Sequence, residues 1–360
     1  MKKKLMQWTY FLDILGFGEE QKSIDTQKKA DEFMEFMKIN KSLIDWQENI
    51  DIKFYSDKNI NIYDYYDFKS VFISDSFVLT AIPKETKFNE ENYYHFSTQI
   101  IMELTFKILI LIEHILTEKG LLLRGGISNK FTDIDIENSL VVGAGLIEAY
   151  KLESSFAEVP RILLSQEVSK DKKIMSYFEK HSKKYGKNFS IFYKDTQNDD
   201  FYYLDYLGFI LSFMNKSENQ RLNIQDEFKD KYGMSKDIIE GLKLLLKEKY
   251  SEDFQKKTFK FLQKHKLSQK DIKKLTTMIK NSEQILRDKS NDINNIKHIK
   301  HTTIKTLSKL QEVISLHLNT YSDNQKILNK YIWLRKYLNN TIDKFPEMDF
   351  IQEYKIINEK

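Results

Sequence analysis

Residues 8–17, WTYFLDILGF, are apolar on both sides of the chain except for one carboxylate. Tyr10, Leu12 and Ile14 alternate with side chains that are also largely apolar, which predicts a β-strand buried on both of its faces. Strand interiors disfavour aspartate, and an isolated buried charge costs several kcal/mol unless a partner compensates it. The sequence therefore raises the question of which group compensates the charge of Asp13.

The first two hundred residues continue to alternate between extended and helical patterns. Residues 70–82 predict a hairpin that turns at Ser74, Asp75 and Ser76. A long helical pattern over 92–118 stops at Gly120, a residue type that commonly ends helices. The other expected elements are a strand over 9–15, a helix over 26–40, a strand over 121–128, a helix entered through two glycines within 139–155, and strands over 161–165 and 201–207.

This order predicts an α+β sandwich with helices on one face of a largely antiparallel sheet. Most of the eleven glycines lie in the first part of the chain, whereas the later part is rich in Lys, Asn, Glu and Ile and looks helical. We therefore expect an α+β domain over 1–212 and a helical C-terminal region over 213–360. Its best helix covers 324–342, with Ser322 and Gln325 placed as a capping box.

The composition narrows the function classes. With 57 basic and 53 acidic residues and a net charge of +4, charge alone does not indicate a nucleic-acid or membrane binder. The chain has no cysteine, which excludes disulfides and thiolate sites and fits a cytoplasmic protein. The most apolar run, 100–116, contains Glu103, Lys107 and Glu113 at positions that favour a buried helix over a membrane span.

A second carboxylate, Asp75, stands at the expected hairpin tip in an apolar context. Two aspartates on adjacent strands can jointly hold divalent cations, and two such ions suit attack of a hydroxyl on a phosphate. A turn at Gly16 to Gly18 would present backbone N–H groups to a triphosphate. The plainer interpretation of Asp75 is an ordinary turn residue, because turns favour Asp.

Four segments in this order, FLDILGF, FISDSF, LLLRGGIS and VVGAGLIEAYKLE, resemble the motifs of the class III nucleotidyl cyclase domain. The resemblance covers about residues 8–207 and is greatest to the pyrimidine cyclases of bacterial Pycsar anti-phage systems. It implies a ferredoxin-like, palm-type sandwich. It also implies conversion of UTP or CTP to a 3′,5′-cyclic nucleotide and pyrophosphate, as a second messenger (cUMP or cCMP) in antiviral defence.

The resemblance also implies roles for individual residues. Asp13 and Asp75 match the two metal aspartates, and the Ile14 carbonyl would join them in holding two Mn²⁺ or Mg²⁺ ions. Lys151 matches the arginine that steadies the transition state, although a solvated helix lysine is the plain alternative. The residues that match the turn facing the triphosphate are Leu15, Gly16 and Phe17.

Arg124 lies beside two glycines in the expected strand, where a ligand can approach closely. We expect it to contact phosphate or to pair with a neighbour such as Glu148. Val71 and Leu140 fall where cyclases of purine nucleotides read the base, and Ile147 falls where they carry a ribose-contacting asparagine. Because apolar side chains cannot hydrogen-bond a purine edge, we expect a pyrimidine substrate, UTP ahead of CTP on family habit.

The family resemblance implies a head-to-tail homodimer whose composite sites join the aspartates of one chain to the Lys151 segment of the other. It further implies a separate cyclic-nucleotide effector that forms no stable complex with the cyclase. We expect no nucleic-acid or membrane partner. Two alternatives stay open: a catalytically silent homologue that serves as a regulatory or nucleotide-binding module, and a purine cyclase that uses ATP or GTP.

Overall fold

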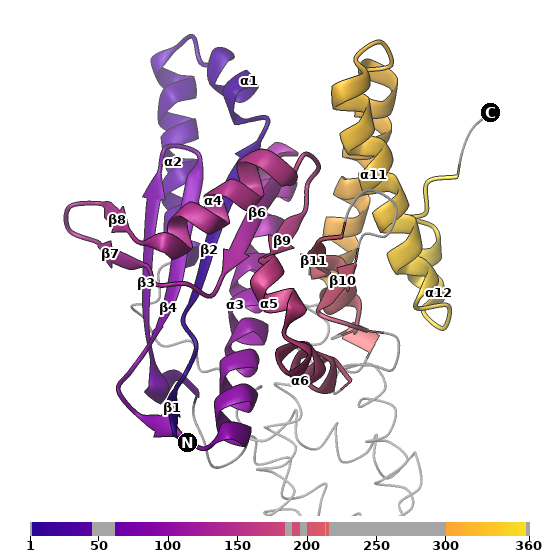
Figure 1. The fold of residues 1–360 in the computed structure, drawn as a ribbon. Coiled ribbons are helices and arrows are strands. Elements are labelled where there is room, and N and C mark those ends of the chain that lie inside the picture. The colour runs from indigo at the N-terminus through magenta and orange to yellow at the C-terminus, as the bar shows by residue number, and fades with distance from the viewer. Residues whose placement is uncertain are drawn as a thin grey trace, which may run out of the picture. The chain divides into compact units, whose positions relative to one another are not determined.

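The structure is a computed structural model that describes residues 2–44, 62–183, 189–194, 200–212, 214–215 and 300–357. One compact unit comprises Met1–Phe213 and Thr302–Lys360 (Figure 1), and a second comprises Met214–His301, which lies almost entirely outside the described residues. The predicted division into domains 1–212 and 213–360 stays a prediction. Residues 302–360 belong to the second of these predicted domains, but in the structure they group with the first compact unit.

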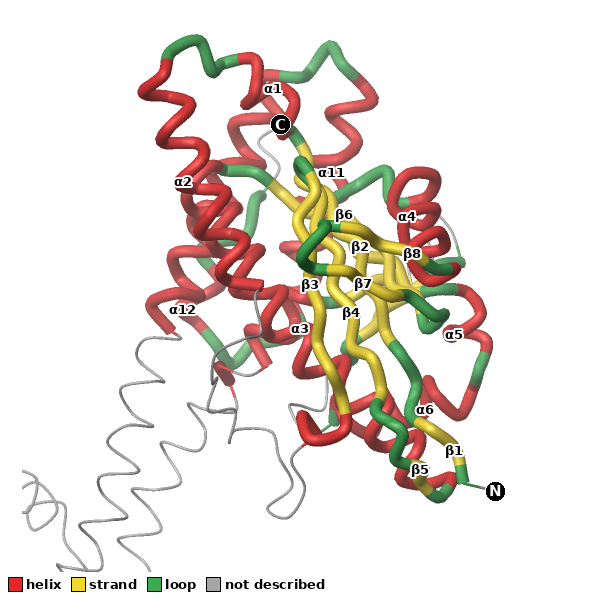
Figure 2. The backbone as a smooth tube through the Cα atoms, turned by 90° about the vertical axis from the view of Figure 1, so that its left-hand side faces the viewer, coloured by secondary structure: helices red, strands yellow, loops and turns green. Residues whose placement is uncertain are grey.

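A seven-stranded mixed sheet forms the centre of the first unit (Figure 2), in the order β10-β11-β9-β6-β2-β4-β3. All its neighbouring pairs are antiparallel except β6 and β9, which run parallel. The predicted α+β class and largely antiparallel sheet are confirmed. The strands are β2 (Trp8–Leu15), β3 (Tyr66–Ile73), β4 (Ser76–Pro83), β6 (Leu122–Ser128), β9 (Ile162–Leu164), β10 (Phe192–Lys194) and β11 (Tyr202–Leu204).

Two small ribbons flank this sheet. One pairs β1 (Lys3–Lys4) with β5 (Lys87–Phe88), and the other pairs β7 (Asp133–Asp135) with β8 (Leu140–Val142). The predicted hairpin is confirmed as β3 and β4, and Ser74 in its turn adopts a φ of 58°.

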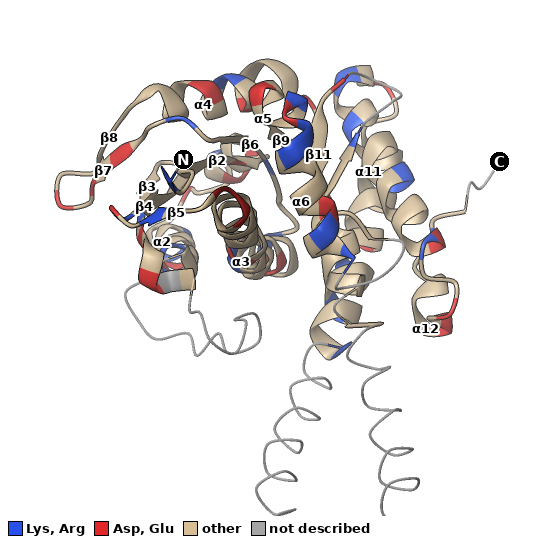
Figure 3. Ribbon diagram, turned by 60° about the horizontal axis from the view of Figure 1, so that its bottom comes forward, with Lys and Arg blue, Asp and Glu red and all other residues tan. Residues whose placement is uncertain are grey.

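Helices cover both faces of the sheet, so the expectation of helices on one face is wrong. Figure 3 shows α4 (Ala144–Phe156) on one side and α2 (Gln27–Ile44) and α3 (Glu90–Lys119) on the other. Trp8 of β2 donates its indole N–H to the Ser97 carbonyl of α3, whereas Phe11 packs edge-on against Tyr150 of α4. The helical pattern of α4 predicts a helix but does not specify which face of the sheet it covers.

The long helix α3 is close to its predicted span. Asn89 caps its first turn by accepting from the Asn92 amide, and Gly120 ends it with a φ of 67°. Its expected apolar stripe faces the core, as the full burial of Ile100, Leu104 and Ile108 indicates. Within the described residues, no helix has both the length and the apolar character that crossing a membrane requires.

The remaining helices are shorter or belong to the C-terminal stretch. They are the 3₁₀ turn η1 (Ile62–Tyr65), α1 (Phe17–Lys22), α5 (Gln166–Lys170), α6 (Lys172–Ser182), α11 (Gln325–Asp343), α12 (Asp349–Gln352) and a helix whose described part covers 300–320. The helix predicted over 324–342 is confirmed as α11, but the predicted capping box is wrong. Asn324 is the N-cap and accepts from the Ile327 amide, so the cap lies nearer the helix than Ser322.

Asp205, which follows β11 and is fully buried, ties α11 to the sheet. Tyr337 donates its hydroxyl to Asp205 Oδ1 at 2.8 Å, and Lys344 Nζ lies 3.1 Å from Oδ2. The Gly208 amide also donates to Oδ1, and the Leu207 amide donates to the Tyr337 hydroxyl. Two stretches separated by more than a hundred residues therefore share one satisfied buried network.

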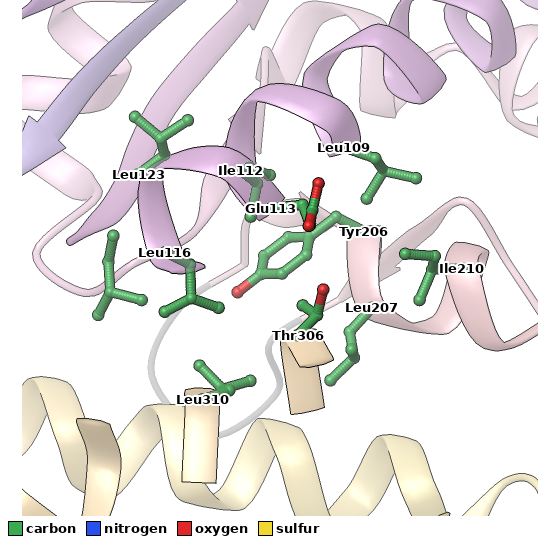
Figure 4. A pocket seen from close by; sticks show the side chains of 11 residues that line it. Leu109, Ile112, Glu113, Leu116, Leu123, Tyr206, Leu207, Ile210, Thr306 and Leu310 are labelled. Carbon is green, nitrogen blue, oxygen red and sulfur yellow. The ribbon is translucent and has the colours of Figure 1, made fainter. Parts of the chain in front are cut away.

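An apolar pocket lies where α3, the segment after β11 and the helix over 300–320 come together (Figure 4). Leucine side chains from all three segments line it, including Leu109, Leu207 and Leu310. Tyr206 also lines the pocket, and burial raises the pKa of its hydroxyl. These contacts extend the core of the first unit to the C-terminal stretch.

The first test concerns the Asp205 network. Tyr337→Phe removes the hydroxyl that bonds both Asp205 and the Leu207 amide, and leaves that buried amide unpaired. We expect the free energy of unfolding to fall by about 1–3 kcal/mol, measured by urea unfolding followed by circular dichroism. Tyr150→Phe is the matched control, because its ring is more than half exposed and keeps its contact with Phe11. Equal unfolding midpoints for the two variants would contradict this role of the network.

Candidate functional site

Strand pairing brings Asp13 next to both the hairpin turn and β6. Asp13 lies opposite Ser76 on β4 and opposite Arg124 on β6. The Ile14 amide donates to the Asp75 carbonyl at 3.1 Å, so Asp75 follows directly in the same register. The two aspartates predicted from the sequence therefore lie at one edge of the sheet.

Arg124 supplies the positive charge that Asp13 requires. Its Nε donates to Asp13 Oδ2 at 3.1 Å, and its Nη2 lies 3.0 Å from the same oxygen. Nη2 also lies 2.6 Å from Glu153 Oε1, an ion pair whose angle does not suit a hydrogen bond. One guanidinium thus bridges a carboxylate of β2 and a carboxylate of α4. The sequence interpretation proposed divalent cations as the compensation for Asp13 and did not consider Arg124 in that role; the metal site itself stays a prediction.

The alternative of an ion pair between Arg124 and a neighbouring residue is confirmed, but the suggested partner, Glu148, is wrong. Glu148 pairs instead with Lys130 at 3.1 Å and accepts from the Ser128 hydroxyl. Glu148 and Glu153 are five residues apart, so they lie on different sides of α4. The expected phosphate contact of Arg124 stays a prediction.

The carboxylates of the site are held in a poorly solvated and negatively charged environment. Burial raises the pKa of Glu153 to about 7, and the negative charges of Asp13 and Asp75 add to this effect against the opposing charge of Arg124. Burial also raises the pKa of Asp13, which Arg124 opposes and Asp75 reinforces. Asp13 and Glu153 therefore share one guanidinium, and Asp75 adds a third acidic group nearby, which leaves the site able to accept a further cation.

The donor set suits a hard divalent cation. Asp13 and Asp75 offer carboxylate oxygens, which Mg²⁺ and Mn²⁺ prefer. In antiparallel pairing the N–H and C=O of one residue point to the same side, so the Ile14 carbonyl is directed towards the Asp75 turn. In the part of the chain that the structure describes, no group of three or more His, Asp or Glu side chains forms a ready metal site. Binding at this edge would therefore combine two carboxylates with a backbone carbonyl.

The turn after β2 depends on a glycine. Gly16 caps α1 with a φ of 90°, and a Cβ there would lie 3.1 Å from Leu121 Cδ2. A side chain at this position would be strained by both its backbone conformation and its neighbour. Leu15 ends β2 and Phe17 is buried against Phe33. The three predicted phosphate-facing residues therefore form a tight turn whose backbone is fixed by packing on both sides.

Lys151 lies on the exposed side of α4. Glu153 is two residues further on, which is more than half a helical turn away, and it faces the sheet. No ion pair of Lys151 occurs among the described residues. The structure therefore does not bring Lys151 to Asp13 within one chain.

The positions expected to read the base differ in exposure. Val71 is buried in a cluster with Val78 and Ile134, whereas Leu140 on β8 is exposed. Ile147 on α4 is also exposed, with 68% of its surface accessible. Both expected base positions are apolar, and neither carries a hydrogen-bonding group.

Sequence reasoning missed Glu153. Glu153 lies four residues after Ala149 on the buried stripe of α4, next to Leu152. A glutamate on an apolar helical stripe is a signal of a buried partner, and here that partner is Arg124.

Comparison of this chain with protein-family models and with curated proteins gives no match. The class III cyclase resemblance and the roles that it implies therefore stay predictions.

The second test uses the raised pKa of Glu153. The folded protein keeps a proton on this group that the unfolded chain releases, so stability falls as pH rises between the ordinary pKa and about 7. Glu153→Gln carries no titratable proton, and its amide mimics the protonated acid. In metal-free buffer, the variant should become more stable relative to the wild type as pH rises from about 5 to 8.

Urea unfolding at each pH measures this difference. The exposed Glu158→Gln serves as the control and should keep the pH slope of the wild type. If Glu153→Gln also keeps that slope, Glu153 is not the buried acid that we describe.

Proposed function

We propose that this protein is a nucleotidyl cyclase of the class III type that converts UTP, or CTP, to a 3′,5′-cyclic nucleotide and pyrophosphate. The observation that carries the proposal is the pairing of β2 with β4 and β6, which puts Asp13 beside the Asp75 turn and opposite Arg124. The carboxylates of Asp13 and Asp75, with the Ile14 carbonyl that points towards the Asp75 turn, are a suitable ligand set for Mn²⁺ or Mg²⁺. The glycine turn that follows β2 is at the same edge.

In the proposed reaction, the ribose 3′-hydroxyl oxygen forms a bond to the α-phosphorus and loses its proton. The bond from the α-phosphorus to the oxygen that bridges to the β-phosphate breaks, and pyrophosphate leaves with that electron pair. When bound, two divalent ions lower the pKa of the hydroxyl and hold the leaving phosphates. Asp13, Asp75 and the Ile14 carbonyl would hold these ions. The backbone of Leu15, Gly16 and Phe17 would face the triphosphate.

Arg124 has the free donors that a phosphate contact needs. A guanidinium carries five N–H groups, and the described contacts of Arg124 are on Nε and Nη2. Nη1 is therefore left for a phosphate oxygen. Glu153 would act as a positioning residue, because it holds the guanidinium at this place.

An exposed apolar patch supports the proposed homodimer. We call it the α4–β8 patch, and its members are large hydrophobic residues on α4, on β8 and in the loop before β7: Phe131, Leu140, Val142, Ile147 and Tyr150. Several exposed large hydrophobic residues on neighbouring segments are a feature of protein interfaces. Lys151 adjoins the patch on the exposed side of α4. A partner bound here would receive Lys151 at its own carboxylates, which is the composite site that we propose.

The apolar positions Val71 and Leu140 favour a pyrimidine over a purine. A site that lacks hydrogen-bond donors and acceptors matching the edge of a purine base cannot select for a purine. UTP ahead of CTP follows from the family resemblance. We further propose that the cyclic product acts as a second messenger in anti-phage defence, through a separate effector.

A second candidate is a catalytically silent homologue that binds or senses nucleotides. One observation favours it: Arg124 already neutralises Asp13 without any metal ion. The two candidates differ in whether Asp13 and Asp75 bind a divalent cation and support turnover.

The third test separates these candidates. Asp13→Ala and Asp75→Ala should each lower turnover by several orders of magnitude, because each removes a carboxylate ligand of the proposed ions. Incubation with Mn²⁺ and each of the four ribonucleoside triphosphates, followed by mass spectrometry, identifies the products. We expect cUMP to dominate for the wild type. Mn²⁺ should also raise the melting temperature of the wild type but not of either variant.

Asp67→Ala is the matched control, since Asp67 is an exposed aspartate of the same hairpin. It should retain both activity and the Mn²⁺ shift. If cyclic AMP or cyclic GMP is the main product, the pyrimidine substrate is contradicted but the cyclase proposal is not. If the wild type forms no cyclic product and Mn²⁺ does not raise its melting temperature, the cyclase proposal is contradicted in favour of the catalytically silent homologue.

The fourth test concerns the composite site. Asp13→Ala and Lys151→Ala should each be inactive as homodimers, but a mixture of the two should recover part of the activity. A mixed dimer contains one site with intact aspartates and an intact lysine. A mixture of Asp13→Ala and Asp75→Ala should stay inactive, because both changes affect the same half of the site. Failure of the first mixture to recover activity would place Lys151 outside the site.

A further inference from the structure

The guanidinium of Arg124 contacts two carboxylates through the same nitrogen. Its Nη2 lies 3.0 Å from Asp13 Oδ2 and 2.6 Å from Glu153 Oε1, while Nε donates to Asp13 alone. Asp13 and Glu153 therefore divide the charge of one arginine between them. The shorter contact, to Glu153, gives the guanidinium an anchor that does not depend on Asp13.

Asp13 is also the carboxylate that the proposed divalent cation needs. Arg124 lies directly opposite Asp13 in the pairing of β2 with β6, so its guanidinium reaches the carboxylate from the neighbouring strand. Both side chains are largely out of solvent, which leaves the interaction of their charges little screened. A cation already bound to a carboxylate lowers the affinity of that carboxylate for a second cation. Arg124 is thus a cation of the protein itself that opposes metal binding at Asp13.

The position of Glu153 is fixed by close packing of α4 on β6. The strand has no room for a Cβ at Gly126, where one would overlap the carbonyl oxygen of Ala149. Glu153 lies about one turn after Ala149 on the same buried side of the helix, and only 3% of its surface is exposed. The backbone contact therefore holds the Glu153 carboxylate in one place, as a fixed second partner for Arg124.

We propose that Arg124 competes with the divalent cation for Asp13, and that Glu153 weakens this competition by binding the same guanidinium. Glu153 is then a positioning residue through which α4 sets the affinity of the site for metal ions. As a cation draws on the charge of Asp13, the contact with Glu153 keeps the guanidinium at the site. The inference deepens the proposed function and rests on its metal site.

Mn²⁺ binding to the full chain, measured by isothermal titration calorimetry without nucleotide, tests the competition. Arg124→Gln should lower the Kd for Mn²⁺ by about tenfold or more, because Asp13 is no longer shared with a cation. Lys130→Gln is the control for net charge. Lys130 follows the same strand but pairs with Glu148 and Glu167, so this variant should bind Mn²⁺ as the wild type does. Asp13→Ala should lose the binding, which assigns the signal to this site.

A double-mutant cycle tests the role of Glu153. Glu153→Gln should raise the Kd for Mn²⁺ several-fold, because Arg124 then interacts with Asp13 alone. The same change in the Arg124→Gln background should have little effect. The double variant also avoids leaving Glu153 as a buried charge without its partner. If Arg124→Gln alone fails to fold by circular dichroism, the double variant replaces it and should bind Mn²⁺ more tightly than Glu153→Gln does.

The competition is overturned if removal of Arg124 does not tighten Mn²⁺ binding, if Lys130→Gln tightens it equally, or if Asp13→Ala binds as the wild type does. An equal effect of Glu153→Gln in both backgrounds would contradict its action through Arg124. If neither the wild type nor Arg124→Gln binds Mn²⁺, the metal site of the proposed function is wrong, and this inference with it. Mn²⁺ binding without turnover would contradict the proposed reaction alone.

Discussion

The bridge from Arg124 to Asp13 and Glu153 is the interaction on which this end of the sheet depends. It joins β2, β6 and α4 through one guanidinium, with Glu153 almost fully buried. Removal of one member of a buried ion pair leaves an uncompensated charge, which costs more than the intact pair contributes. The three elements are therefore held in one relative position wherever Asp13 is ionised. Any cation that binds Asp13 must share it with Arg124.

Glycine at the adjacent positions of β6 makes this bridge possible. A Cβ at Gly126 would lie only 2.2 Å from the Ala149 carbonyl oxygen, and one at Gly125 only 2.3 Å from the Phe11 carbonyl oxygen. The absence of a side chain at Gly126 lets α4 approach the sheet closely enough for Glu153 to reach Arg124, whereas Gly125 lets β6 lie close to β2. The close packing of α4 and the ion pair between Arg124 and Glu153 thus both depend on Gly126.

Those features of the site that depend on residues near one another in the chain can be predicted from the sequence. Alternation in β2, the turn residues of the hairpin and the glycine after α3 identify those elements, and Asp13 and Asp75 are brought together as expected. Glu153 was missed because its role depends on the face of the sheet that α4 covers, which periodicity does not determine. The partner of Arg124 was misassigned for the same reason as Glu153.

The unit that carries the site is built from two separate stretches of chain, Met1–Phe213 and Thr302–Lys360. Asp205 is synthesised long before Tyr337 and Lys344, its partners in the folded protein. Translation proceeds at roughly 5–20 residues per second, so the interval between them is on the order of ten seconds. During that time the end of the sheet at β11 lacks the helix that covers it. The fold can therefore be completed only late in translation or after it. A ribosome-bound chain that ends before α11 exposes the Asp205 carboxylate, which the finished protein buries.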